Sequence, residues 1–337
     1  MNKTILRTVS GPARFAGVLM LVFIFQTVAA KDVLWFSNIP PESSKKVRFS
    51  GMHRLASIGG RRGAKVIQWL RMGDDVEHAR YVAPGRNDDY AFYFFSPQQT
   101  PDTAKFVTRG KSAFFTFANK KEGYYNAYLV VKKLSGDTLY VSVAKDELLN
   151  HSCRNGHKNV RRHIGPWTYP EYVTFELVRE RTLKENFHYF ASSGDILRYQ
   201  LILDGKPLRN ASVTMVTQTG WKKMLKTGEN GYVEFQLIQD YFSPWKELNR
   251  RKIYYYLIYG EITVPQQGEY MGKPYSYVHY TTSMSDGYRP ARSMYQSMFW
   301  AFVVFILTVF VSVIFVFVYR LKRSRVYKED MLDEKDY

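Results

Sequence analysis

One stretch in the middle of the chain concentrates side chains that bind transition metals. Three of the seven histidines and the single cysteine fall within residues 151–163. A thiolate with two or three imidazoles suits copper, zinc, nickel or cobalt, and the Asn155-Gly156 turn would let these groups converge. The alternative is a basic surface loop around a capped free cysteine, because Arg and Lys interrupt the run. The candidate metal ligands are His151, Cys153, His157 and His163.

No other group of residues forms a recognisable reactive centre. The sequence contains neither a G-x-S-x-G nucleophile elbow nor an H-E-x-x-H zinc motif, so we predict a protein that is not an enzyme. Trp221, Trp245 and the tyrosines at 254–256 could form an aromatic face for sugars, although such residues are more often core in a sandwich. The other histidines are isolated and are expected at the surface or in packing contacts: His53, His78, His188 and His279.

The residues on both sides of the metal-ligand stretch predict β-strands. Aromatic residues make up 16% of the chain, and Tyr and Phe favour strands. Short apolar runs recur about every ten residues between Gly- and Pro-containing turns, which is typical of sandwiches. We therefore expect an all-β fold of two tandem immunoglobulin-like or transthyretin-like sandwiches, joined by a polar and basic loop. The best-defined strands are predicted at 90–95, 113–117, 138–144, 196–203, 210–217 and 232–237. The strand at 196–203 leads into an Asp-Gly turn at 204–205, and we expect the strand at 210–217 to be its return strand.

Residues 298–319 have the composition of a membrane-spanning helix. They contain no charge, no Gly and no Pro, and they exceed the ~18 residues that a span requires. The basic residues that follow indicate the cytoplasmic side, next to an anionic inner leaflet. These residues are Arg320, Lys322, Arg323 and Arg325.

The N-terminus agrees with that orientation. Lys3, Arg7 and Arg14 precede a short apolar run at 15–25 and the small residues before Ala30, which indicates a signal peptide. The alternative is an uncleaved anchor. The expected organisation is a signal peptide at 1–30, sandwiches at 31–150 and 172–290, a loop or linker at 151–171, a span at 298–319 and a cytoplasmic tail at 320–337.

Charge and cysteine usage bear on location and partners. One cysteine allows no intramolecular disulfide. Because a eukaryotic cell-surface immunoglobulin domain usually carries a disulfide pair, this favours a bacterial periplasm and anchoring in the inner membrane. The formal net charge is +18, of which +14 lies outside the signal peptide and the tail. Nucleic acid is an unexpected target outside the cytoplasm. Anionic lipid, anionic envelope polymers or an acidic protein partner are the candidates, and general solubility is the alternative.

Two segments in the second half carry a family resemblance. They read LDGKPLRNASVTMV at 203–216 and KTGENGYVEFQL at 226–237. These segments resemble carboxypeptidase-regulatory-like and transthyretin-like sandwiches. The whole plan of signal, sandwich and C-terminal span resembles the periplasmic accessory subunits of cobalt/nickel ABC importers. Members of that family often begin the mature chain with Ala-His, whereas this one begins with Lys31-Asp32-Val33.

The resemblance implies a membrane-anchored accessory subunit that binds an integral-membrane partner in transition-metal transport. Two alternatives remain open at this point. The first is a metal-binding protein that uses the loop with His151, Cys153 and His157. The second is a scaffold for envelope polymers, suggested by the basic charge.

Overall fold

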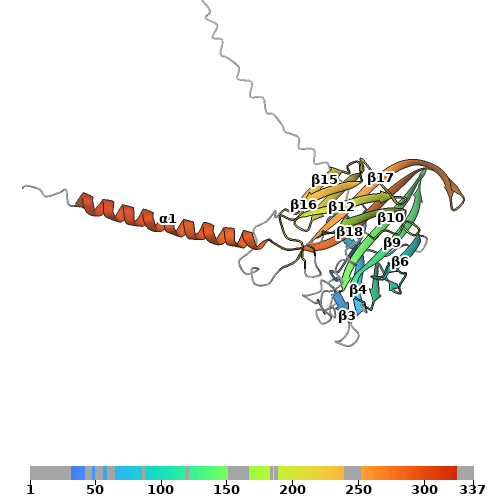
Figure 1. Ribbon diagram of the computed structural model, residues 1–337, viewed down its shortest axis with the longest axis horizontal. Coiled ribbons are helices and arrows are strands. Elements are labelled where there is room, and N and C mark those ends of the chain that lie inside the picture. Colours follow the sequence, from blue (N-terminus) through green and yellow to red (C-terminus); the bar gives the residue numbers. More distant parts are fainter. Residues whose placement is uncertain are drawn as a thin grey trace, which may run out of the picture. The chain divides into compact units, whose positions relative to one another are not determined.

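The computed structural model describes residues 32–41, 48–49, 56–58, 65–85, 88–118, 121–150, 167–182, 185, 189–238 and 252–324. These residues form three β-sheets and one helix (Figure 1). The predicted all-β sandwich class with a C-terminal apolar helix is therefore confirmed.

Sheet A has seven strands and sheet B has seven, whereas sheet C has four. Sheet A contains β1 (Leu34–Ser37), β2 (Arg48–Phe49), β3 (Ala56–Ile58), β4 (Lys65–Met72), β5 (Arg80–Tyr81), β7 (Lys105–Arg109) and β8 (Ser112–Phe117). Sheet B contains β6 (Asp89–Phe95), β9 (Gly123–Ser135), β10 (Thr138–Asn150), β14 (Ser212–Thr217), β15 (Lys222–Lys226), β17 (Tyr254–Tyr270) and β18 (Lys273–Tyr288). Sheet C contains β11 (Phe175–Glu180), β12 (Ile196–Leu203), β13 (Lys206–Pro207) and β16 (Tyr232–Gln236).

Sheet B is the middle layer, with one core on each face. Successive side chains of a strand point to opposite faces. On β9, Tyr125, Ala127 and Leu129 join the core shared with sheet A. Tyr128 and Val130 join the core shared with sheet C. Both faces of β9 are buried over most of its length, so it reads as a nearly continuous apolar run.

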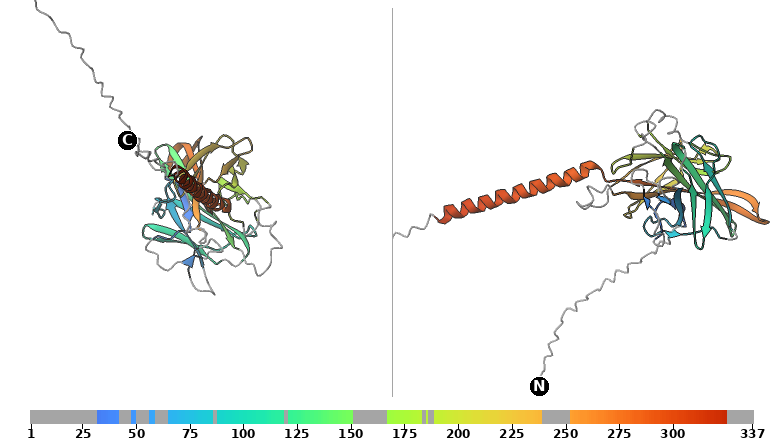
Figure 2. Two further views of the ribbon diagram at one scale, coloured as in Figure 1. Left: turned by 90° about the vertical axis from the view of Figure 1, so that its left-hand side faces the viewer. Right: turned by 90° about the horizontal axis from the view of Figure 1, so that it is seen from below.

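The two halves of the chain meet inside sheet B. β10 from the first half pairs in parallel with β18 from the second, from Thr138 opposite Tyr277 to Lys145 opposite Met284. The strand order is β15-β14-β17-β18-β10-β9-β6. Figures 1 and 2 show green strands of the first half beside orange strands of the second half. The two sandwiches therefore share their middle sheet, which differs from the expected tandem arrangement. The sequence does not reveal this, because strand patterns do not specify pairing partners distant in the chain.

The strand predicted at 210–217 forms, but in another sheet than expected. Asp204 and Gly205 have positive φ angles of 49° and 72° and make the predicted tight turn. The expected return partner of β12 was the 210–217 strand, but only the short β13 pairs there. The chain then crosses to sheet B, where β14 pairs with β17. β14 is buried on both faces from Val213 to Thr217, because it lies in the middle layer, whose two faces are both covered.

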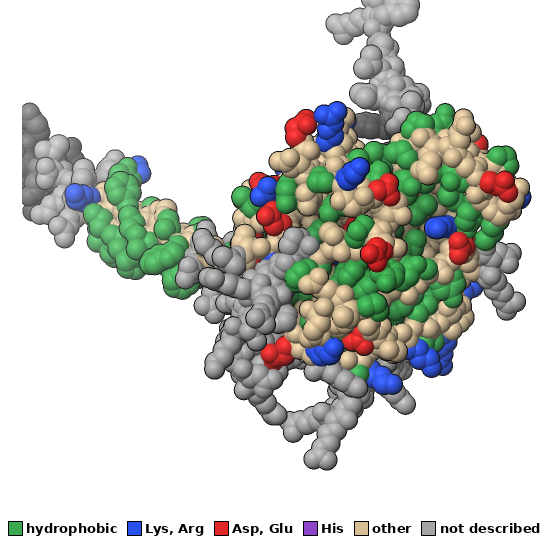
Figure 3. Space-filling view, turned by 45° about the vertical axis from the view of Figure 1, so that its right-hand side comes forward, with side chains coloured by type: hydrophobic (Ala, Val, Ile, Leu, Met, Phe, Trp, Pro, Cys, Tyr) green, Lys and Arg blue, Asp and Glu red, His purple; other side chains and the backbone are tan. Residues whose placement is uncertain are grey.

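Part of the basic charge lies along sheet edges. β15 is an edge strand of sheet B, and its Lys222, Lys223 and Lys226 are exposed. β7 is an edge strand of sheet A with exposed Lys105 and Arg109. Lysine on an edge strand opposes pairing with another chain. On the face shown in Figure 3, basic and acidic side chains are interspersed. Edge protection thus accounts for these charges without an anionic partner.

Helix α1 (Arg292–Ser324) contains the predicted span. Its segment Phe299–Arg323 contains an 18-residue window with a mean hydropathy of 3.1, none of that window is buried, and the segment is long and apolar enough to cross a membrane. The hydroxyls of Thr308 and Ser312 donate to the carbonyls of Val304 and Thr308, at 2.9 and 2.8 Å. These bonds satisfy both polar groups within the helix, as an apolar environment requires.

The connection between β18 and α1 is short and held at one residue. The Arg289 amide donates to the Ala191 carbonyl at 2.9 Å, and its carbonyl accepts from the Ser193 amide at 2.8 Å. The guanidinium lies 3.8 Å from the centre of the Phe190 ring. Only Pro290 and Ala291 separate Arg289 from the helix. The last strand is therefore fixed to the sandwich immediately before α1.

Phe115→Ala tests whether the shared sheet couples the two halves. Phe115 is fully buried, with ring centroids 4.9 Å from Phe36 and 5.2 Å from Phe92. Its loss should lower the free energy of unfolding by about 3–5 kcal/mol. Hydrogen exchange should show slow amides in β8 and β12 losing protection by the same factor.

Phe106→Ala is the control, because Phe106 is only partly buried and lies on the edge strand β7. It should cost less than Phe115→Ala. Loss of protection in sheet A alone, with β12 unchanged, would show that the halves unfold independently.

Candidate functional site

The predicted metal ligands lie outside the described residues. His151, Cys153, His157 and His163 all fall in the range 151–166, which the structure does not describe. In the part of the chain that it does describe, no group of three or more His, Cys, Asp or Glu side chains could hold a metal ion. The metal site therefore stays a prediction.

The tyrosines at 254–256 and Trp221 do not form an aromatic face, and Trp245 lies outside the described residues. Tyr254 and Tyr256 are 5% and 0% exposed and belong to the core between sheets B and C. The Tyr256 hydroxyl lies 2.8 Å from that of Tyr199 on sheet C. Trp221 is partly buried against the same core. These residues pack the sandwich, as the alternative interpretation of the sequence expected.

Two of the isolated histidines are described, and they differ in setting. His78 Nδ1 lies 2.8 Å from Asp75 Oδ2 at the surface, and this bond raises the pKa of His78. His279 lies on β18, where its Nδ1 is 2.8 Å from the Thr263 hydroxyl of β17. Its ring centroid is 5.4 Å from that of Tyr140 on β10. His279 is therefore part of a cross-strand cluster in sheet B.

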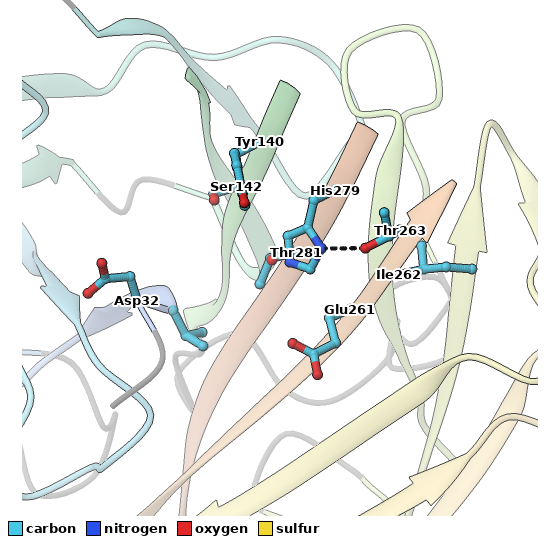
Figure 4. Close-up of a pocket in the computed structure, with 9 residues that line it drawn as sticks. Asp32, Tyr140, Ser142, Glu261, Ile262, Thr263, His279 and Thr281 are labelled. Carbon is cyan, nitrogen blue, oxygen red and sulfur yellow. Dashed lines mark hydrogen bonds between the residues drawn. The ribbon is translucent and has the colours of Figure 1, made fainter. Parts of the chain in front are cut away.

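This cluster lines an open groove of about 490 Å³ on the sheet A side of sheet B (Figure 4). Asp32 lies on one side of it, with His279, Thr263 and Glu261 on the other. We call it the β10–β18 groove. The residues that line it are Asp32, Val33, Tyr140, Ser142, Glu261, Ile262, Thr263, His279 and Thr281.

Strand register brings these side chains together. Tyr140, His279 and Thr263 are direct neighbours across β10, β18 and β17. Ser142, Thr281 and Glu261 form the next row on the same face, two residues along each strand. Residues that are more than 100 positions apart thus line one surface. Within the sequence, the only sign of this surface is the polar, every-second-residue pattern at the start of β18.

The groove begins where sheet A stops covering sheet B. The hydroxyls of Ser283 and Ser285 on β18 donate to the carbonyls of Leu34 and Phe36 on β1, the second at 2.6 Å. β1 therefore lies directly over that part of β18. Thr281 and His279 come earlier on β18, beyond the end of β1. Asp32 and Val33, just before β1, form the edge of the groove.

The groove exposes more apolar than polar surface, and the charged groups that line it are acidic. It contains two carboxylates, Asp32 and Glu261, and none of its lining residues is Lys or Arg. Arg80 lies beside it and contacts Asp32 at 3.2 Å, with both side chains well exposed. Hydroxyl groups from four of the lining residues add donors and acceptors. The arrangement offers hydrogen bonds to a polar ligand and disfavours an anionic one.

A second polar cluster is buried between sheets B and C. Lys145 is fully buried on β10, and its Nζ lies 2.9 Å from Glu176 Oε1 and 3.0 Å from Glu147 Oε1. It also donates to the Leu177 carbonyl at 3.0 Å. Glu147 pairs in addition with Arg181. All three donors of the ammonium group thus have buried acceptors.

Adjacent pairs extend this cluster along β11. Arg179 contacts Glu185 at 2.8 Å and Asp286 at 3.2 Å. The Tyr128 hydroxyl donates to Glu176. The cluster joins β10 and β18 of sheet B to β11 of sheet C. Each Lys and Arg named in this cluster contacts a Glu or Asp. These ion pairs hold sheets B and C in one register.

The electrostatics of the cluster follow from burial and pairing. Burial alone would raise the pKa of Glu147, but the charges of Arg181 and Lys145 outweigh it and lower that pKa to about 2. Burial would lower the pKa of Lys145, but Glu176 and Glu147 outweigh it and raise that pKa. Both groups are therefore ionised at neutral pH. Neither is available as a general acid or base.

Asp146 differs from its neighbours. It is 6% exposed, and its Oδ2 has no hydrogen-bond partner among the described residues. Burial, together with the negative charges of Asp286 and Glu147, raises the pKa of Asp146 well above its ordinary value. Burial and the neighbouring negative charges therefore favour the neutral form of this carboxyl group.

Comparisons with known proteins add little. No family model and no curated protein matches the chain. A DUF4785 family protein from Legionella pneumophila aligns with 11% identity and a TM-score of 0.20, covering 59% of this chain and 47% of that one. The chain thus matches about half of that protein's length. The D0-D1 domain of Intimin aligns with 14% identity and a TM-score of 0.22, covering 66% and 90%. At such scores neither similarity carries an argument about function.

Lys145→Met tests the buried cluster. The substitution keeps the volume but leaves Glu147 and Glu176 without their shared cation, and breaking a buried pair costs about 3–5 kcal/mol. We expect a loss of that size in urea unfolding at pH 7. The Glu147 contribution should be complete above its ordinary pKa of 4.5 and lost as the pH falls towards 2.

Lys222→Met is the matched control. Lys222 contacts Asp74 at 2.7 Å, but its side chain is 44% exposed, so the change should cost at most about 1 kcal/mol. Equal losses in the two variants would refute a stabilising role for the buried cluster.

Asp146→Asn should stabilise the protein, and the gain should grow with pH. In the unfolded chain Asp146 ionises near pH 3.8, whereas the folded protein holds the proton. The wild type therefore loses stability as the pH rises above that value, and asparagine removes the effect. Thermal unfolding of both proteins at pH 4 and pH 7 measures the difference.

Asp204→Asn, at the exposed turn after β12, is the control and should leave the pH dependence unchanged. A pH-independent effect of Asp146→Asn would show that Asp146 is ionised in the folded protein.

Proposed function

We propose that this chain is a non-enzymatic, membrane-anchored interaction subunit whose β-sheets lie outside the cytoplasm. The observation that carries the proposal is the continuous path from β18 through Arg289 into the exposed apolar helix α1. Lys322 and Arg323 in the last turn of α1 indicate a cytoplasmic C-terminus. The short, fixed connection keeps the sandwich beside the membrane. With the predicted signal peptide, this favours the periplasmic face of a bacterial inner membrane.

An integral-membrane protein is the partner we propose. The sandwich would meet such a protein outside the bilayer, and α1 would meet it within the bilayer. The resemblance of the sequence to accessory subunits of cobalt/nickel importers supports the membrane subunits of a metal importer as partner. Any metal delivered would be cargo, with His151, Cys153, His157 and His163 as its predicted ligands.

Photo-cross-linking in intact cells tests the partner. At 100° per residue, Phe302, Phe310 and Phe317 lie on one side of α1, and Phe315 lies on the opposite side. All are exposed, from 57% for Phe302 to 72% for Phe315. With a photoreactive phenylalanine at each position, an adduct to one integral-membrane protein should form from one side of the helix and not from the other.

The two sides provide a control for each other, since lipid surrounds a helix without a partner. Adducts absent at every position, or equally spread over many proteins at all positions, would contradict the proposal. Metal content of the full chain, compared with a Cys153→Ala variant, tests the metal link separately.

A further inference from the structure

The open end of sheet B combines aromatic rings with polar groups on one face. Tyr140 is 42% exposed, and its ring packs against that of His279 with an angle of 55° between the planes. Tyr277 is 43% exposed and precedes His279 by two residues on β18, so it points to the same face. Three rings thus lie on one face of the sheet, two of them lining the β10–β18 groove and Tyr277 beside it.

Hydrogen-bonding groups adjoin these rings in the next row of the sheet. Ser142 and Thr281 contribute hydroxyls, and Glu261 contributes a carboxylate. A sugar ring has the complementary pattern, because its C–H face packs on aromatic rings and its hydroxyls exchange hydrogen bonds at the edge. The pairing of an apolar face with a few oriented polar groups is what a small-ligand site requires.

The charge and the size of the groove favour a neutral small ligand. An anionic ligand would meet Asp32 and Glu261 with no Lys or Arg among the lining residues, and Arg80, which lies beside the groove, already contacts Asp32. A metal would need a group of three or more ligating side chains, and none exists among the described residues. The volume of about 490 Å³ lies within the range of roughly 300–1,000 Å³ that is typical of small-ligand sites. The groove is open, so a chain of sugar rings could continue beyond it.

From these observations we infer that the β10–β18 groove binds an uncharged oligosaccharide, with Tyr140, His279 and Tyr277 as the stacking surface and Glu261, Ser142 and Thr281 as hydrogen-bonding groups. This function goes beyond the proposed interaction with a membrane partner and does not depend on it. It also differs from recognition of an anionic polymer, which the overall charge alone would suggest.

Calorimetry with the full chain in lipid nanodiscs tests the inference, since nanodiscs avoid detergents with sugar head groups. The probes are the neutral tetrasaccharides chitotetraose, cellotetraose and maltotetraose, with tetragalacturonate and tetralysine as anionic and cationic comparisons. At least one neutral probe should bind, and tetragalacturonate should not. Tyr140→Ala should weaken binding by about threefold to tenfold, the effect of one aromatic contact, whereas Tyr140→Phe should retain it.

Tyr90→Ala is the matched control, because Tyr90 is 43% exposed on the edge strand β6 and does not line the groove. It should leave binding unchanged. The inference fails if no neutral tetrasaccharide binds, if only tetralysine or tetragalacturonate binds, or if Tyr90→Ala weakens binding as much as Tyr140→Ala. Each of these results leaves the cross-linking of α1 unaffected.

Discussion

The parallel pairing of β10 with β18 is the interaction on which the rest of this fold depends. It joins residues 138–145 to residues 277–284 and so unites strands from both halves of the chain in one seven-stranded sheet. Sheets A and C can then cover opposite faces of that sheet. The same pairing sets Tyr140 beside His279 and Lys145 beside Met284. It therefore determines both the groove and the position of the buried charges.

The buried charges make this register hard to change. Sliding β11 along sheet B by one residue would separate Glu176 from Lys145 and leave both in an apolar layer, at a cost of several kcal/mol per ion. A purely apolar contact between the layers would tolerate small shifts more easily, because dispersion and burial have little directionality. The ionic cluster contributes specificity of register, and the aromatic cores on either side contribute the bulk of the burial.

Much of the local structure could be predicted from the sequence, and little of the tertiary arrangement. Alternation in residues 232–237 and the apolar run at 298–319 identify a strand and a helix, because both patterns are local. The 210–217 strand was assigned correctly, but its partner was not, since β14 pairs with β17, which begins only at Tyr254. The groove was missed for the same reason. Nothing near Tyr140 indicates that His279 will lie beside it.

The strand that carries His279 is also the strand that leads into helix α1. Tyr288 lies nine positions after His279 on β18, which corresponds to about 30 Å of extended chain, and Arg289 is fixed to the sandwich directly afterwards. β18 is paired with β10 up to Met284 and with β17 up to Tyr288, and this pairing limits how far the strand can bend or shorten. Whatever occupies the groove would be held at a nearly constant distance along β18 from the start of α1. The fold thus determines the distance between the groove and α1 as well as the groove itself.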